Sequence, residues 1–183
     1  MIPSVLAVLY VVLLVLAAAA AAGLSVAAWW RPTPPLVYAS VAAVAAALLL
    51  SAVPAGDPGF AVDALITVLA LAAAIVGGGP AATTALRMAT RGSVADGDHG
   101  GIIQDGSEVL RGGTAIGLLE RLAVAAVIIA GFPEGLAVIV AIKGVGRFTE
   151  LDAAAPRERF IIGTFASLIW AAACAGIAVL ARA

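Results

Sequence analysis

Charged side chains inside apolar segments are the residues of this sequence that could do chemistry. Glu120 and Arg121 interrupt one apolar stretch, and Lys143, Arg147 and Glu150 follow in the next; we call these residues the charged cluster. Ionisable groups are costly in a lipid bilayer, so they are kept where they pair with one another or act on a ligand. Three cations and two carboxylates leave one net positive charge, which favours an anionic partner such as a phosphate group.

Two interpretations of the charged cluster stay open. In the structural one, Glu120 neutralises Lys143 or Arg147 and fixes the register of a helical hairpin. In the functional one, the cluster lines a polar cavity that binds an anionic head group, a proton or another ion. If a turn lies at residues 131–133, a rise of 1.5 Å per residue places Glu120 about 18 Å and Lys143 about 16 Å from that turn. The two side chains are therefore predicted to face each other.

The composition places the charged cluster in a membrane protein. Of the 183 residues, 63% are hydrophobic and 11% are charged, and the mean hydropathy is +1.14. A soluble domain has about 45–50% apolar and about 25% charged residues. The chain therefore lacks the polar surface of a soluble enzyme or a disordered chain. Its net charge of -1 argues against a nucleic-acid binder, and its single cysteine argues against a disulfide scaffold.

Uncharged stretches predict an all-α, polytopic transmembrane helical bundle that forms one domain, residues 1–183. About 20 apolar residues cross a bilayer as a helix. Such stretches occupy residues 1–30, 32–56, 64–86 and 160–181. A tight turn at 131–133 would join two more helices, from about Thr114 to Ala130 and from Glu134 to Glu150, giving about six helices. Five helices with a re-entrant hairpin are the alternative.

The basic residues predict which side of the membrane each loop faces. With six helices, alternate loops contain nearly all of the Lys and Arg residues: Arg31 in the first, Arg87, Arg91 and Arg111 in the second, and Lys143, Arg147, Arg157 and Arg159 in the third. Because positively charged loops stay in the cytoplasm, the N-terminus and the C-terminus are both predicted to lie outside. The expected location is the bacterial cytoplasmic (inner) membrane, as a multi-pass protein.

Residues 77–113 are predicted to form a long cytoplasmic loop with a short amphipathic segment. The run Gly77-Gly78-Gly79-Pro80 is expected to break the third helix and to act as a hinge. Residues 81–90 then place two arginines on one helical face, which suits a surface of anionic lipid. Arg111 lies at the end of this loop, beside the N-terminus of the next helix, where free amide groups could meet an anion.

The same loop contains the candidates for a metal site, Asp96, Asp98, His99 and Asp105. Hard divalent cations prefer several carboxylate oxygens. This spacing matches no EF-hand, however, and one histidine does not make a zinc motif. A solvated turn is therefore the favoured interpretation, and the sequence implies no particular cofactor.

Three ordered motifs occupy about the last 70 residues. They are Ile116-Gly117-Leu118-Leu119-Glu120-Arg121, then Ala141-Ile142-Lys143 with Arg147-Phe148-Thr149-Glu150-Leu151, and then Ile162-Gly163-Thr164 with Ser167. This part resembles an uncharacterised family of bacterial integral membrane proteins, whose members carry I-G-x-L-E-R, A-K-S-x-x-R-F-x-E-L and G-T-x-x-S in the same order. Gly144 stands where those proteins usually have Ser, and their N-terminal helix with His, Asp and Gln has no counterpart here. The resemblance implies that the charged cluster acts as one unit, and it supplies no activity.

These observations favour a protein that is not an enzyme and that binds or translocates an anionic lipid or ion through the charged cluster and Arg111. Its partners are then membrane lipids. The second hypothesis is a small structural or accessory subunit of a larger membrane complex, or a homo-oligomer, because small residues four apart let membrane helices pack closely. The third is a metal-dependent enzyme that acts on a lipid-linked phosphate through the aspartates and histidine of the loop.

Overall fold

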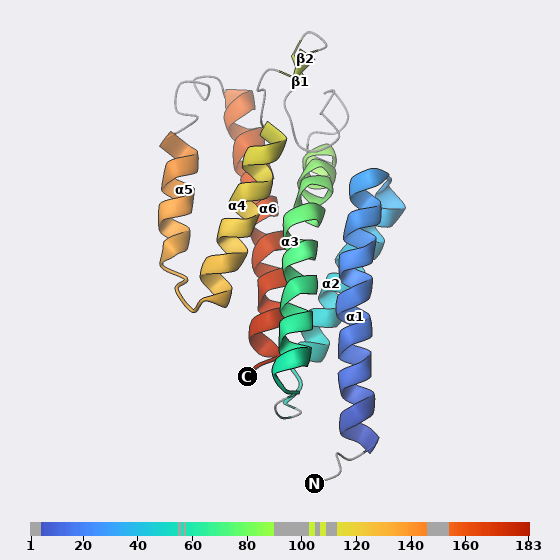
Figure 1. The fold of residues 1–183 in the computed structure, drawn as a ribbon. Coiled ribbons are helices and arrows are strands. Elements are labelled where there is room, and N and C mark those ends of the chain that lie inside the picture. Colours follow the sequence, from blue (N-terminus) through green and yellow to red (C-terminus); the bar gives the residue numbers. More distant parts are fainter. Residues whose placement is uncertain are drawn as a thin grey trace.

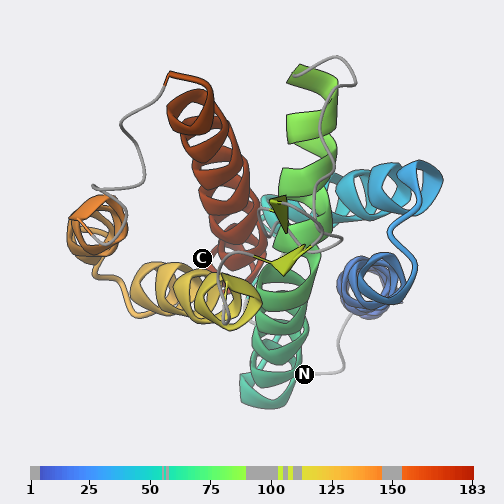
Figure 2. The ribbon, with the colours of Figure 1, turned by 90° about the horizontal axis from the view of Figure 1, so that it is seen from above.

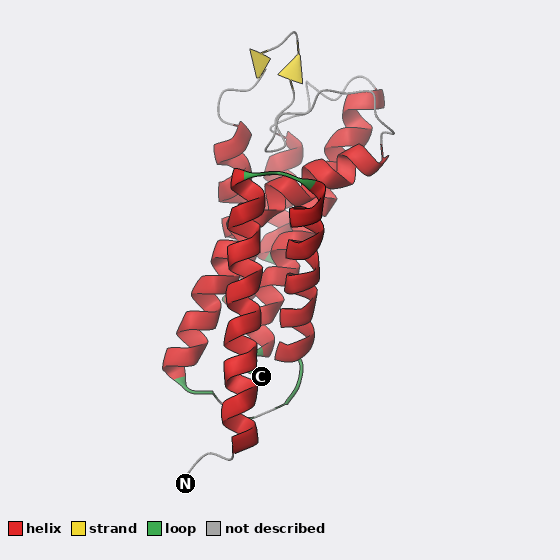
Figure 3. Ribbon diagram, turned by 90° about the vertical axis from the view of Figure 1, so that its right-hand side faces the viewer, coloured by secondary structure: helices red, strands yellow, loops and turns green. Residues whose placement is uncertain are grey.

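The computed structural model describes residues 5–54, 56, 58–89, 103–104, 107–108, 113–145 and 154–183. These residues form six helices: α1 (Val5–Trp30), α2 (Pro34–Ser51), α3 (Phe60–Ala89), α4 (Gly113–Ile129), α5 (Gly135–Val145) and α6 (Ala154–Leu180). Two-residue strands β1 (Ile103–Gln104) and β2 (Ser107–Glu108) pair antiparallel beyond one end of the bundle (Figure 3). The predicted all-α helical bundle of about six helices is confirmed.

Four of the described helices are long and apolar enough to cross a membrane: α1, α2, α3 and the Glu158–Leu180 part of α6. Helices α4 and α5 have 17 and 11 described residues, fewer than the roughly 20 that cross a bilayer. The start of α1 and the end of α6 lie at the same end of the bundle (Figure 1), as six helices of alternating direction require. The chain is therefore a membrane protein with its two terminal helix ends on one side.

The centre of the bundle is formed by α3 and α6, which pack along each other. Helices α1 and α2 lie on one side of this pair, and α4 lies on the other with α5 at the edge (Figure 2). Small residues fill the contacts, since Ala47, Ala73, Ala171 and Ala175 are completely buried. In lipid, such small side chains let helix backbones approach closely. Backbone carbonyls of α3 are thereby brought within reach of polar side chains from its neighbours.

The turn between α4 and α5 is a tight cap of the kind that glycine makes. Gly131 has a positive φ of 73°, and its N–H donates to the carbonyl of Ile128 at 3.0 Å. The next N–H, of Phe132, reaches back to the carbonyl of Val127 at 2.8 Å, which completes a Schellman motif. The predicted turn is therefore confirmed, and it directs α5 back along α4.

The prediction that Gly77-Gly78-Gly79-Pro80 breaks the third helix is wrong. Helix α3 continues through Pro80 to Ala89, so residues 77–89 belong to this helix and not to a loop. Helical hydrogen bonding is strongly favoured in a bilayer, and a single proline bends a helix without ending it. In Figure 1 the lower part of α3 is seen from the side and its light-green end nearly end-on, which shows the bend.

Candidate functional site

Glu120 of α4 and Lys143 of α5 form an ion pair. Lys143 Nζ donates to Glu120 Oε2, and both side chains are largely buried, with 20% of Lys143 and 17% of Glu120 exposed. Lys143 Nζ also lies 5.9 Å from the centre of the Phe160 ring of α6, at cation–π distance. The pairing predicted from the hairpin spacing is confirmed. The pair joins the two helices of the hairpin, and through Phe160 it also contacts α6.

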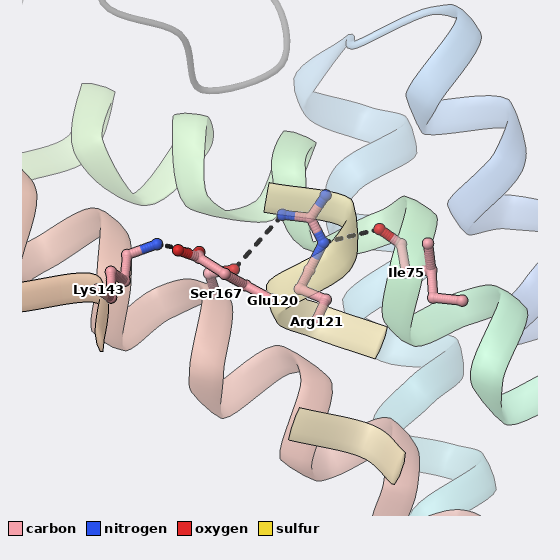
Figure 4. Close-up of polar contacts among 5 residues, drawn as sticks. All are labelled: Ile75, Glu120, Arg121, Lys143 and Ser167. Atoms are coloured by element: carbon pink, nitrogen blue, oxygen red, sulfur yellow. Dashed lines mark hydrogen bonds and ion pairs between the residues drawn. The ribbon is translucent and has the colours of Figure 1, made fainter. Parts of the chain in front are cut away.

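Arg121 points away from that ion pair, toward α3 and α6 (Figure 4). Only 5% of the residue is exposed. Its Nε donates to the backbone carbonyl of Ile75 at 2.7 Å, and its Nη1 donates to Ser167 Oγ at 3.5 Å. The guanidinium is thus held where α3, α4 and α6 meet, and its partners in this part of the chain are neutral oxygens.

Glycines on two helices make room for Arg121. A Cβ atom at Gly78 of α3 would lie less than 3.0 Å from Arg121 Cδ. At Gly117 of α4, one turn before Arg121, the three atoms nearest to a Cβ would all belong to the guanidinium, with Nη1 at 3.2 Å. A larger side chain at Gly78 would displace Arg121, and one at Gly117 would force a small shift of its guanidinium. The glycine run of α3 is therefore a surface that admits a neighbouring side chain.

Trp170 of α6 uses the same run. A Cβ atom at Gly77 would lie less than 3.0 Å from the Trp170 ring and 2.8 Å from Ser25 Oγ. Trp170 is 6% exposed, and its Nε1 donates to the carbonyl of Ala73 at 2.9 Å. Trp170 is not among the site residues predicted from the sequence. The sequence feature that could have indicated this contact is the run of three glycines inside an apolar span, because such a run leaves space for a bulky side chain of another helix.

The charge balance of the described site leaves Arg121 without an anionic partner. Within the described ranges, the ion pair between Lys143 and Glu120 is the one found, and it uses the only carboxylate of α4 and α5. Arg121 therefore remains as a buried cation among helices that face lipid. A buried cation of this kind can bind an oxyanion, because the guanidinium fork matches two oxygen atoms.

Seven of the predicted site residues lie outside the described residues: Arg111, Arg147, Glu150, Asp96, Asp98, His99 and Asp105. Of the predicted ligand-binding residues, Glu120, Arg121 and Lys143 are described, and they divide between the ion pair and the Arg121 contacts. Within the described part of the chain, no group of three His, Cys, Asp or Glu residues lies close enough to hold a metal ion.

Comparison with known proteins finds no family model that matches this chain and no significantly similar curated protein or solved structure. The assignment to a class therefore depends on the helices and on the site that they form: this is a helical membrane protein with a buried ion pair and, beside it, a buried arginine.

Proposed function

We propose that this protein binds or translocates an anionic lipid or ion through the charged side chains of α4 and α5, and that it is not an enzyme. The observation that carries the proposal is Arg121. It is 5% exposed, and no carboxylate of the described residues lies within ion-pair distance of it. The proposal places the protein in the bacterial cytoplasmic membrane, with lipids as its partners.

The energetics of a buried cation support this function. An ionisable group within the bilayer costs several kcal/mol unless it is paired, on the order of 2.5–3.5 for an arginine at a helix centre. Glu120 offsets only part of this cost, because it attracts Arg121 at longer range while its ion pair is with Lys143. The neutral oxygens of Ile75 and Ser167 satisfy hydrogen bonds and carry no charge. A bound anion would supply the missing negative charge.

The depth of Arg121 suits a ligand that enters from the cytoplasmic side. Arg121 is eight residues after Gly113, so it lies about 12 Å from the end of α4 that the charge distribution assigns to the cytoplasm. Side chains on a helix lean toward its N-terminus, and the guanidinium of Arg121 lies beside Gly117, one turn nearer to that end.

The surface of α5 favours a second function, that of an accessory subunit. Helix α5 packs chiefly on α4, and its apolar side chains Val138, Ile142 and Val145 are 59%, 68% and 78% exposed. A helix of a partner protein, or of a second copy, could cover these side chains in place of lipid. A stable polypeptide that co-purifies with the chain would support this alternative.

Native mass spectrometry tests the anion proposal. The protein is released from nanodiscs made of phosphatidylcholine with or without an equal part of phosphatidylglycerol. We expect discrete adducts of the anionic lipid, or of an inorganic anion, in excess of phosphatidylcholine adducts. Bare protein, or equal retention of the two lipids, would contradict the proposal. A bound polypeptide in place of the lipid would favour the subunit function.

A further inference from the structure

The guanidinium of Arg121 is only partly used by the protein. An arginine has five N–H donors. Nε donates to the carbonyl of Ile75, and Nη1 makes one long bond, of 3.5 Å, to Ser167 Oγ. Figure 4 shows that the other terminal nitrogen carries no bond to the residues drawn and points away from both acceptors. Among the described residues, the edge formed by the two terminal nitrogens therefore keeps N–H donors that no protein acceptor uses.

Ser167 adds a donor at this edge. Its Oγ accepts the bond from Arg121, so its own O–H is directed elsewhere, and within the described residues no acceptor for it is found. Two guanidinium nitrogens and one hydroxyl thus lie side by side on α4 and α6. A fork with an adjacent hydroxyl is the donor set that a phosphate oxyanion takes, because its oxygens accept bonds in several directions.

Small residues continue along the same helical faces toward the predicted cytoplasmic end. Gly113, Gly117 and Arg121 are four residues apart on α4, so they share one helical face. Gly163 and Ser167 have the same relation on α6. Side chains on a helix lean toward its N-terminus, and the guanidinium of Arg121 accordingly lies beside Gly117. At Gly117 the room is taken by the guanidinium itself, and a Cβ at Gly163 would contact Leu86 at 3.4 Å. Glycine has no side chain, so neither residue places a competing polar group beside Arg121 and Ser167.

We infer that Arg121 and Ser167 form a binding site for one phosphate oxyanion, that of a lipid head group or free phosphate. The inference rests on the proposed function and makes it specific. Arg121 is one cation with no ion-pair partner among the described residues, and it matches one negative charge. Lys143 is not a ligand in this arrangement, because its ammonium is held by Glu120 and lies over Phe160. Lys143 is a positioning residue that keeps the hairpin in register.

Two arms of the experiment separate the two sources of the phosphate group. In the lipid arm, native mass spectrometry measures phosphatidylglycerol retained from nanodiscs of equal parts phosphatidylcholine and phosphatidylglycerol. In the second arm, the protein in dodecyl maltoside is titrated with sodium phosphate, and its unfolding temperature is compared with that in sodium chloride of equal ionic strength. Lipid retention without phosphate stabilisation identifies a head group, and stabilisation by phosphate identifies the free anion.

The variants test the assigned residues. Arg121→Lys keeps the positive charge and loses the planar pair of terminal N–H groups. Ser167→Ala loses only the hydroxyl. Each removes one charged hydrogen bond, so we expect binding to weaken about tenfold in each variant. Arg159→Lys makes the matched change at an arginine of α6 outside the site, and it should bind as the wild type does. Lys143→Met should lose less affinity than Arg121→Lys.

Each contrary result has a distinct meaning. If the wild type retains the anion and both Arg121→Lys and Ser167→Ala retain it equally well, the assigned site is wrong and the anion-binding function stands. The same holds if Lys143→Met alone loses the anion. If the wild type binds neither phosphatidylglycerol nor phosphate, the function fails together with the site. Ser167→Ala preserves the packing of α6, so it decides the question even if Arg121→Lys does not fold.

Discussion

Glu120 and Arg121 are consecutive residues of α4, yet their side chains contact different helices. Glu120 pairs with Lys143 of α5, whereas Arg121 reaches Ile75 of α3 and Ser167 of α6. Successive side chains on a helix point about 100° apart, so neighbours in sequence can serve separate contacts. One dipeptide therefore joins the peripheral hairpin to the centre of the bundle.

The glycine run of α3 should tolerate no added methyl group at Gly77. In Gly77→Ala the new Cβ would overlap the Trp170 ring, and we expect a loss of about 1–3 kcal/mol in the free energy of unfolding. The matched control is Gly144→Ala on α5, where a Cβ would have no neighbour within 4 Å. Reversible unfolding in mixed micelles measures both. Equal stability of the two variants would show that α3 and α6 are not packed as described.

Removing one member of the ion pair should lower the free energy of unfolding by more than half of what removing both members does. Glu120→Gln or Lys143→Met leaves a charge without its partner, and we expect each to lower stability by about 1–2 kcal/mol. This is less than the 3–5 of a fully buried pair, because both side chains are partly exposed. The double variant should lose less than the sum of the two single losses. Strictly additive losses in the same unfolding assay would exclude a coupled pair.

Pro80 should be the cause of the bend in α3. Proline lacks the N–H of one helical bond, and its ring displaces the preceding turn, so Pro80→Ala should straighten the helix. Spin labels at Phe60→Cys and Met88→Cys, both exposed positions, report the change when Cys174 is replaced by Ala. A straight helix of this length separates the labelled backbone positions by about 42 Å. The measured distance should rise toward that value in Pro80→Ala, and an unchanged distance would assign the bend to packing.

The predicted orientation can be read from thiol accessibility. Phe132, in the turn after α4, is 58% exposed and is predicted to lie outside. With Cys174 replaced by Ala, Phe132→Cys should react with a membrane-impermeant maleimide in intact spheroplasts. Arg31→Cys, between α1 and α2, should react only after the membrane is opened. The reverse pattern would place both terminal helix ends in the cytoplasm.

The features that depend on position along the chain were predictable from the sequence. Uncharged length marks the long helices, and Gly131 marks the turn of the hairpin. Counting residues from that turn was enough to bring Glu120 to Lys143, because the helical rise is constant.

The direction in which each side chain points around its helix axis was not predictable from the sequence. The sequence does not state which neighbour a given face of α4 meets, so the separation of Arg121 from Glu120 appears only in three dimensions. The error at Gly77–Pro80 has a related origin. Local propensity predicts that glycine and proline end a helix. In the folded chain, however, the glycines of α3 provide the space into which Trp170 and Arg121 of other helices pack.

Gly78 brings Arg121 and Trp170 to the same point of α3. A Cβ at this position would lie less than 3.0 Å from Arg121 Cδ and 3.1 Å from Cδ1 of the indole ring. The positive charge of Arg121 therefore acts on the ring at short range, where little water screens it. The other two tryptophans, Trp29 and Trp30, lie at the end of α1. An anion that neutralised Arg121 would change the electric field across one indole and shift its fluorescence, so the chain contains its own optical reporter of charge.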